Sequence, residues 1–514
     1  MNNKYYYITT PIYYPSANPH MGHAYSSIVA DVFARFKRLD GYNVYFLTGT
    51  DEHGLKIQKA AEKNNQRPKV FCDNISKIFK DLSRALNLSN DDFIRTTEER
   101  HHKAVQFLWD RLISKGYIYL SKYKGWYSIS DEAYYNEDEI VEKDGKKISK
   151  ISGSFVEWVE EESFFFKLSS FQEKLLTFYN KNPKFILPTA RRNEVTSFVK
   201  SGLKDLSVSR KSFSWGIKVP NDEKHIIYVW LDALTNYISA LNYPNTEDKL
   251  FKNFWPATLH IIGKDILRFH AIYWPAFLLA AEIEPPNRVF GHGWILSDKE
   301  KMSKSKGNIL DPLEMIKIYG LDQLRYYLVK EVSFGNDGNI SNENIENCIN
   351  SDLANNYGNF CQRTFSFVEK NCKGIVPSDV KFNSDDLKIL NSISNNINKI
   401  RSLIDDQQLN EYVKFIIDKS SDANKYFNDE SPWSKKGDKK RLDTIVYVSL
   451  EVIRKISILL LPIIPYSANK VLASLNLDPR TLKLSSITDH LINRSGTKII
   501  NQGILFKKIN KNDD

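Results

Sequence analysis

The chain has 514 residues, of which 42% are hydrophobic, and this composition excludes a disordered protein and predicts several domains with buried cores. Its 72 basic residues exceed its 62 acidic ones, so the formal net charge is +10, as expected of a protein whose ligands are polyanions. A bias of the whole proteome toward Lys and Asn would raise the charge in the same way without any such ligand.

The four cysteines are too few and too irregularly spaced for a disulfide framework, which indicates a reducing compartment. The longest apolar runs, residues 269–281 and 456–464, are short and contain proline. The first residues carry neither an Arg-rich leader nor an apolar signal core. We therefore expect a cytoplasmic protein.

Residues 5–23, YYYITTPIYYPSANPHMGH, combine a strand, a loop and the start of a helix. Aromatic and β-branched residues at 5–10 favour a half-buried strand, and the three prolines after them prevent a helix before position 20. Apolar residues at helical spacing predict a helix over 24–39, which Gly41 caps.

His20 and His23 therefore lie near a helix N-terminus, where unpaired backbone N–H groups and the helix dipole favour a polyphosphate. Gly22 between them lets a nucleotide approach the backbone closely. The alternative is a pair of ordinary histidines.

The next segment continues this alternation of strand and helix. Residues 43–48 predict a second buried strand, GTDEHG follows it, and 54–63 have helical spacing. This is the pattern of a doubly wound parallel sheet, which binds ligands at the carboxyl ends of its strands. Asp51 lies at such an end, where its carboxylate can hold the ammonium group of an amino acid; the alternative is an N-cap of the following helix.

A second signature, KMSKS, occupies residues 301–305. Together with HMGH it resembles the two ATP-binding signatures of class I aminoacyl-tRNA synthetases. The segments TTPIYY, LTGTDEHG, VWLDALTNY and IGKDILRFH are similar to those of methionyl-tRNA synthetases in particular, and the resemblance covers essentially the whole chain. It implies an α/β, doubly wound, parallel Rossmann-like catalytic domain with a connective insertion, followed by an α-helical bundle that binds the anticodon.

The resemblance also implies the site residues. The catalytic residues are His20, His23, Lys301 and Lys304, and the ATP-binding residues are His20, Gly22, His23, Gly263, Asp265, Gly291, Lys301, Ser303 and Lys304. The methionine-binding residues are Ile12, Tyr14, Asp51, Trp230, Ala233, Leu234, Tyr237, Ile266 and His270. The apolar members around Trp230 share one helix face, which is more often simply core, and His270 has the same alternative. ATP would enter as its Mg²⁺ complex.

We expect five segments: the first half of the catalytic domain (1–115), the connective insertion (116–225), the second half of the catalytic domain (226–300), the KMSKS segment and linker (301–350), and the helical anticodon-binding domain (351–514). The insertion often carries a zinc site in this family, but no His or Cys lies between His102 and His225. We therefore predict an insertion without zinc.

Apolar spacing predicts helices at 352–368, 386–404 and 444–461. By resemblance, Asn359, Arg363 and Trp433 read the anticodon, and hydrogen-bonding side chains beside a stacking ring suit unpaired RNA bases. The expected partners are initiator and elongator tRNA(Met), methionine and ATP, with no membrane.

We expect a monomer, because the chain ends without the appended RNA-binding domain that some relatives use to dimerise. Two alternative functions are a small-molecule nucleotidyltransferase and a non-enzymatic tRNA-binding relative.

Overall fold

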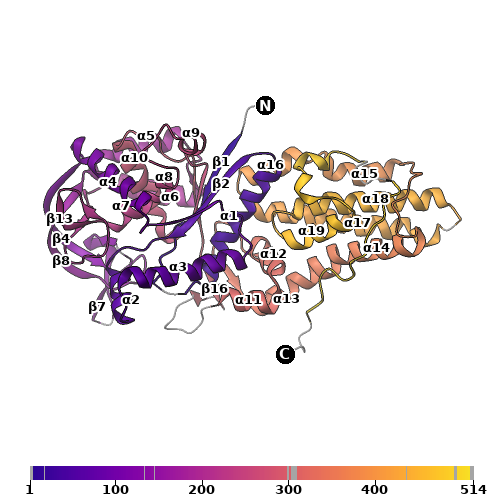
Figure 1. The fold of residues 1–514 in the computed structure, drawn as a ribbon, viewed down its shortest axis with the longest axis horizontal. Coiled ribbons are helices and arrows are strands. Elements are labelled where there is room, and N and C mark those ends of the chain that lie inside the picture. Colours follow the sequence, from indigo (N-terminus) through magenta and orange to yellow (C-terminus); the bar gives the residue numbers. More distant parts are fainter. Residues whose placement is uncertain are drawn as a thin grey trace. The chain divides into compact units, whose positions relative to one another are not determined.

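The computed structural model describes residues 4–509 apart from 17, 132, 144, 298–299, 302–309, 436 and 491–494, and only the backbone of Tyr123, Glu300 and Lys301. The chain divides into two compact units (Figure 1). One, here the sheet unit, comprises Tyr5–Ala30 and Val44–Gly293. The other, the helical unit, comprises Met1–Lys4, Asp31–Asn43 and Trp294–Asp514.

The sheet unit is built on a six-stranded sheet with the order β3-β2-β1-β14-β15-β9. Its strands are β1 (Tyr5–Thr9), β2 (Asn43–Thr50), β3 (Asp92–Arg95), β9 (Ile186–Leu187), β14 (Leu259–Gly263) and β15 (Val289–His292). β14 pairs in parallel with both β1 and β15, and β2 with β3. Because the chain passes from β1 to β2 on one side and returns to β14 on the other, the order reverses between β1 and β14, where such sheets bind ligands.

Helices connect these strands. They are α1 (Met21–Leu39), α2 (Leu55–Lys63), α3 (Pro68–Ala85), α4 (Glu99–Ser114), α5 (Gln172–Lys181), α6 (Thr189–Lys200), α7 (Val229–Leu234), α8 (Asn236–Ser239), α9 (Lys249–Phe254) and α10 (Trp274–Ala280). The helix predicted at 24–39 begins three residues earlier, since the last proline of the loop is Pro19. It ends as predicted: Gly41 has φ 83°, and the N–H groups of Gly41 and Tyr42 donate to Arg38 and Lys37.

The predicted insertion contains antiparallel strands. β4 (Ile118–Ser128) pairs with β8 (Glu157–Phe166) and β5 (Ala133–Tyr135), and β10 (Leu206–Ser207) pairs with β8. A hairpin joins β6 (Ile140–Lys143) to β7 (Lys146–Ser149), and β13 (Asp222–Ile227) lies between β11 (Ser209–Arg210) and β12 (Lys218–Val219). Residues 186–187 were predicted to belong to the insertion, yet β9 is the edge strand of the parallel sheet.

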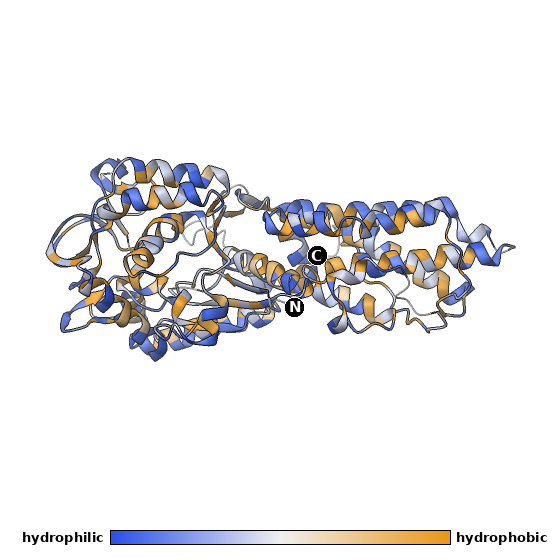
Figure 2. Cartoon of the chain, turned by 90° about the horizontal axis from the view of Figure 1, so that it is seen from above, coloured by the Kyte–Doolittle hydropathy of each residue, from blue (hydrophilic) through white to orange (hydrophobic). Residues whose placement is uncertain are grey.

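The helical unit contains α11 (Pro312–Tyr319), α12 (Leu321–Glu331), α13 (Asn342–Cys348), α14 (Asn359–Asn371), α15 (Ser384–Ser394), α16 (Ile397–Asp405), α17 (Leu409–Glu430), α18 (Lys439–Leu460) and α19 (Pro465–Ser474), and the small sheet of β16 (Ile295–Ser297), β17 (Glu300–Lys301) and β18 (Gly338–Ile340). Hydrophilic residues lie along the outer faces of its helices (Figure 2). Every residue of α18 from Leu442 to Leu460 is buried, so α18 is the core of this unit.

The helices predicted at 352–368, 386–404 and 444–461 are present with shifted bounds. A π-helix, Ile349–Gly358, runs directly into α14, and the second prediction covers both α15 and α16. A buried ion pair joins α1 to α12 within the helical unit: Arg325 donates to Asp31 at 2.7 Å, and both side chains are fully buried. No helix among the described residues has the length and apolar character needed to cross a membrane.

Candidate active site

The HMGH signature forms the N-terminus of α1. The backbone N–H of His20 donates to His23 Nδ1, and that of Gly22 donates to His20 Nδ1, both at 3.0 Å. Because each Nδ1 accepts a hydrogen bond, each neutral imidazole carries its proton on Nε2 and can donate it to a ligand. An ideal Cβ on Gly22 would lie 2.8 Å from Cε1 of His20, so a side chain there would displace that ring.

Both imidazoles are neutral near pH 7. Burial lowers the pKa of His20, and burial together with the neighbouring His20 ring lowers that of His23 well below its ordinary value. The two ring centroids are 4.0 Å apart. The pair therefore offers phosphate oxygens hydrogen-bond donors rather than positive charges.

Aromatic rings fix His23 in place. Tyr13 and Phe79 meet it edge to face at 5.0 and 5.3 Å, and they stack on each other at 5.6 Å. The hydroxyl of Tyr13 forms a hydrogen bond of 2.6 Å with Ser27 of α1. The signature histidine is thus held by the loop after β1, by α1 itself and by α3.

Asp51 follows β2 and is 5% exposed. Its backbone N–H donates to the carbonyl of Tyr13 at 2.9 Å, which ties the Asp51 loop to the loop that contacts His23. The N-cap of α2 is Gly54, with φ 103° and no side-chain cap, so Asp51 does not occupy the N-cap position of this helix. Burial raises the pKa of Tyr237, and the charge of Asp51 adds to this rise, so the carboxylate lies near that phenol.

Two of the predicted methionine-binding residues, Tyr237 and His270, contact each other directly. The hydroxyl of Tyr237 lies 2.7 Å from Nε2 of His270, whose Nδ1 donates to the carbonyl of Ile266 at 3.0 Å. Burial lowers the pKa of His270 to about 4, so the neutral ring accepts from Tyr237. Both nitrogens of His270 are therefore occupied, and the ring positions Tyr237. His270 lies in a short π-helix, Phe269–Tyr273, a local distortion common at functional sites.

The remaining members of this group differ in exposure. Ala233, Leu234 and Tyr237 are buried, whereas the side chains of four others are partly exposed where they pack on the same core: Ile12, Tyr14, Trp230 and Ile266. Phe269 stacks on Trp230 with ring centroids 3.7 Å apart. The group therefore combines buried side chains with partly exposed aromatic rings. We call His20, His23, Asp51, Tyr237 and His270 the chamber.

The predicted nucleotide-binding glycines lie at the ends of neighbouring strands. Gly263 ends β14 and pairs with His292 of β15, and Gly291 pairs with Ile262. Asp265 is exposed, and its charge raises the pKa of His20 against the larger effect of burial, so it lies near the HMGH signature. These residues share the carboxyl edge of the sheet with the chamber. Ser303 and Lys304 lie outside the described residues, as does the side chain of Lys301.

Sequence reasoning missed a network of buried polar residues behind Asp51. Asp232 accepts hydrogen bonds from His53 Nδ1 at 2.6 Å and from His101 Nε2 at 2.7 Å, and all three side chains are buried. Although burial opposes it, the attraction of His53 and His101 holds the pKa of Asp232 well below its usual range. The hydroxyl of Tyr14 donates to the carbonyl of His53 at 2.7 Å, so this network fixes the segment that carries Asp51.

A second buried group holds the residue next to Asp51. Glu52 is fully buried and accepts two hydrogen bonds from Arg95, at 2.6 and 2.9 Å, and one from Thr97 at 2.6 Å. His260 was also missed: the centroid of its ring lies 4.1 Å from that of Tyr237. His292 belongs to the GHGWI segment, residues 291–295, which was a candidate for the nucleotide site, and it forms a hydrogen bond of 2.7 Å with Ser26 of α1. In the sequence, Glu52 and His53 lie in LTGTDEHG and Asp232 lies in VWLDALTNY, two of the segments that carry the resemblance.

The predicted anticodon-binding residues lie in the helical unit. Arg363 donates to the side chain of Asn428 at 2.6 Å, and its guanidinium lies 5.5 Å from the ring of Phe427 and 5.9 Å from that of Trp433. Trp433 is 46% exposed, so it is not a core residue. Asn359 begins α14, one turn before Arg363. We call Arg363, Phe427, Asn428 and Trp433 the Arg363 cluster.

Comparison with known proteins identifies the family. The family model described as "tRNA synthetases class I (M)" matches residues 6–365, and that of the "anticodon binding domain of methionyl tRNA ligase" matches residues 376–514. The chain belongs to the methionyl-tRNA synthetase family. This synthetase is therefore an enzyme, a ligase of the class I aminoacyl-tRNA synthetases.

Individual relatives agree over the full length. The synthetase is 52% identical to the methionine–tRNA ligase of Brucella melitensis over 92% of each chain, and 51% identical to that of Rickettsia conorii over 99% of this chain and 100% of the relative. Its structure resembles Mycobacterium tuberculosis methionyl-tRNA synthetase in complex with methionyl-adenylate, with a TM-score of 0.95, 45% identity and coverage of 98% and 99% of the two chains. For the free form of that enzyme the TM-score is 0.88 at 42% identity, with 99% of each chain covered.

These comparisons confirm the family and the fold class that the sequence predicted. The match of an anticodon-binding model to residues 376–514 argues against a small-molecule nucleotidyltransferase. Among the described residues, no group of three or more His, Cys, Asp and Glu side chains is placed to hold a metal ion.

Proposed function

We propose that this chain activates methionine with ATP to methionyl-adenylate and transfers the methionyl group to the 3′ end of initiator and elongator tRNA(Met). One observation carries the proposal: two neutral histidines with Nε2–H donors lie at a helix N-terminus, and Tyr13 connects them to the segment that carries Asp51. The ring of Tyr13 meets that of His23, and its carbonyl accepts a hydrogen bond from the backbone N–H of Asp51, whose side chain is buried. Donors for a triphosphate and an anion for an ammonium group thus lie on two segments that the same tyrosine connects.

Methionine would bind in the chamber. Asp51 would hold its ammonium group by a charge-assisted hydrogen bond, and the thioether would lie against the rings of Trp230 and Tyr237, a contact that sulfur favours. His270 would keep the Tyr237 hydroxyl directed away from the ligand. Ile12, Tyr14, Ala233, Leu234 and Ile266 would complete the apolar surface.

ATP would enter as its Mg²⁺ complex, with its phosphates at the N-terminus of α1. His20 and His23 would donate to phosphate oxygens, Gly22 would allow the phosphates to reach the backbone, and Lys301, Ser303 and Lys304 would contribute from the second signature. Gly263, Asp265 and Gly291 would contact adenosine at the ends of β14 and β15.

The chemistry then needs no protein nucleophile. The methionine carboxylate attacks the α-phosphorus, the bond to the bridging oxygen breaks, and pyrophosphate leaves. The terminal ribose 2′-hydroxyl of tRNA next attacks the activated carbonyl and displaces AMP. The protein contributes by aligning the reactants and by donating hydrogen bonds to oxygens that gain charge in the transition state.

Recognition of tRNA would use the Arg363 cluster and Asn359, since an exposed tryptophan beside a guanidinium can stack on and hydrogen-bond to unpaired bases. We further propose a monomer without zinc in the cytoplasm. All four cysteines are free thiols, which fits a reducing compartment.

ATP–pyrophosphate exchange, measured with each amino acid in turn, tests the proposal. We expect exchange that depends on methionine and does not require tRNA. Exchange that is independent of methionine, or that follows another amino acid, would overturn it.

A further inference from the structure

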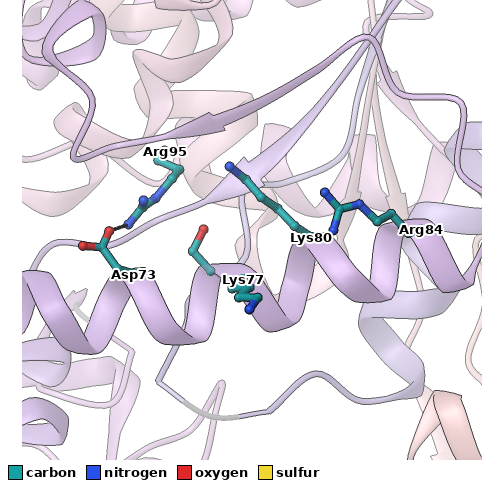
Figure 3. Close-up of a pocket in the computed structure, with 6 residues that line it drawn as sticks. Asp73, Lys77, Lys80, Arg84 and Arg95 are labelled. Carbon is teal, nitrogen blue, oxygen red and sulfur yellow. Dashed lines mark hydrogen bonds and ion pairs between the residues drawn. The ribbon is translucent and has the colours of Figure 1, made fainter.

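A second charged site lies beside α3, in the sheet unit. It is a pocket of about 260 Å³ lined by Asp73, Ser76, Lys77, Lys80, Arg84 and Arg95. Figure 3 shows Asp73, Lys77, Lys80 and Arg84 along one helix, with Arg95 facing them from the neighbouring strand. Four of the lining residues are cations and one is a carboxylate, so the lining carries a net charge of +3. It includes no residue of the chamber and no apolar side chain.

The sequence of α3 places these cations on one side of the helix. Lys77, Lys80 and Arg84 follow one another at intervals of three and four residues, which brings them onto the same face. At 1.5 Å per residue they extend over about 10 Å. The opposite face carries the buried Phe79 and Leu82, so the amphipathic pattern that anchors α3 also turns its cations outward.

These cations are only partly neutralised by the protein. Arg95 is engaged by Glu52 and by Asp73, the latter at 2.5 Å, and Arg84 pairs with Asp81 at 2.8 Å while its side chain remains 78% exposed. Lys80 has a ring contact, 5.1 Å from the centroid of Phe93. In the part of the chain that the structure describes, Lys77 has no acidic partner within ion-pair distance. The pocket therefore presents uncompensated positive charge to solvent.

We propose that this pocket binds phosphate groups in the backbone of tRNA. Several cations spread along a helix suit a strand with repeated charges better than one compact anion. The lining has no aromatic ring and no side-chain amide, so the contact would position the RNA without reading its bases. The inference rests on the proposed function, which supplies the tRNA.

The pocket also adjoins the residues that support the chamber. Phe79, on the same helix, contacts His23, and Arg95 holds Glu52, the neighbour of Asp51. A phosphate bound here would thus lie beside Arg95, which supports the segment that carries Asp51. For this reason Arg95 stays unchanged in the test below.

The test compares two variants that lose the same charge. The pocket variant combines Lys77→Gln, Lys80→Gln and Arg84→Gln. The control combines Lys59→Gln, Lys63→Gln and Arg67→Gln, which remove three exposed cations from α2 and the segment after it. The affinity for tRNA(Met) is measured by fluorescence anisotropy between 50 and 200 mM salt, the exchange of pyrophosphate is measured without tRNA, and a melting curve verifies folding.

We expect the pocket variant to bind tRNA at least about tenfold more weakly than the wild type at low salt. The plot of log K against log salt should also become less steep, and the magnitude of its slope should fall by about 2, because each lost phosphate contact removes about 0.7 to 0.9 from it. The control should change much less. Unchanged binding, or equal losses in both variants, would overturn the proposal. A raised KM for pyrophosphate with unchanged tRNA binding would assign the pocket to free polyphosphate and overturn it as well.

These outcomes are separable from failure of the proposed function. Binding of tRNA is measured without catalysis, so it reports on the pocket even if the wild-type enzyme activates a different amino acid. The dependence of wild-type exchange on methionine tests the function alone.

Discussion

The chamber and the Arg363 cluster hold their ligand-facing groups in opposite ways. In the chamber, His20, His23 and His270 are each fixed through ring nitrogens, and Asp51 is almost fully buried. In the Arg363 cluster, nearly half of Trp433 is exposed. Bond formation at phosphorus requires donors that are already in place, whereas unpaired bases must move onto their stacking partners. The difference in burial thus follows the difference in task.

The largest expected effect is on the signature histidines. His23→Ala should slow adenylate formation about a hundredfold, a loss of about 3 kcal/mol, because it removes a donor that meets the phosphates in the transition state. Lys304→Ala should lower the same step by a similar factor. Pre-steady-state measurement of pyrophosphate release checks both. His23→Gln, which retains an N–H donor, should lose less; an equal loss would show that packing rather than donation matters.

Asp51→Asn should weaken methionine binding by about 1.5 to 3 kcal/mol, since the amide keeps the shape but loses the charge that faces the ammonium group. The KM for ATP serves as the internal control and should change little. Steady-state exchange over a range of both substrates measures the two constants. If the KM for methionine stayed constant while the melting temperature fell, Asp51 would be a structural residue.

Trp433→Ala should lower tRNA charging by roughly 1 to 3 kcal/mol and leave pyrophosphate exchange intact, because it removes a stacking surface outside the chamber. Arg363→Ala should behave in the same way. The melting temperature should hardly change, in contrast to Phe360→Ala, which removes a fully buried ring of the same unit at a cost of about 3 to 5 kcal/mol. Equal losses of charging and exchange would refute the anticodon role.

His270 should make the protein sensitive to acid. Its pKa is about 4 in the native state and roughly 6.5 when unfolded, so only the unfolded state binds the proton as the pH falls below 6.5. Stability should therefore decrease between pH 6.5 and 4, by about 1 kcal/mol from pH 6 to pH 5. Urea denaturation at the two pH values should show this extra loss in the wild type and not in His270→Gln.

Removal of metal ions should have the smallest effect on stability and activity. With no His or Cys between His102 and His225, the insertion lacks the usual zinc ligands. Treatment with a chelator, followed by restoration of magnesium, should leave the melting curve and the exchange activity unchanged. Elemental analysis should find less than one zinc per chain; a stoichiometric amount would contradict the prediction.

Local patterns made the core of the sheet predictable. Prolines, β-branched residues and apolar residues at helical spacing identified β1, α1 and β2. These signals were sufficient because each of them lies within one element. The family signatures then led to Asp51 and Tyr237, which the structure brings near each other. The pairing of strands was harder to predict. β9 has only two residues, too few for any periodicity, and it pairs with β15 from a segment about a hundred residues earlier.

The buried polar network was not predictable from the sequence alone. Asp232 lies among apolar residues of a helix, so its sequence surroundings indicate only a single polar residue within a core. Its partners His53 and His101 are 179 and 131 positions away in the sequence. Nothing local distinguishes a buried carboxylate with two partners from a solvated one. The pocket beside α3 was unpredictable for the same reason, since it also depends on Arg95, which lies in the strand β3.

Because His53 and His101 divide the two oxygens of Asp232 between them, substitutions at these three positions should show strong epistasis. Loss of either histidine leaves a buried carboxylate half satisfied, and loss of Asp232 leaves two buried imidazoles without their acceptor. Once one member has changed, the next change removes little more. Lineages of this enzyme should therefore keep all three residues or replace them together, and single replacements should be rare along the way.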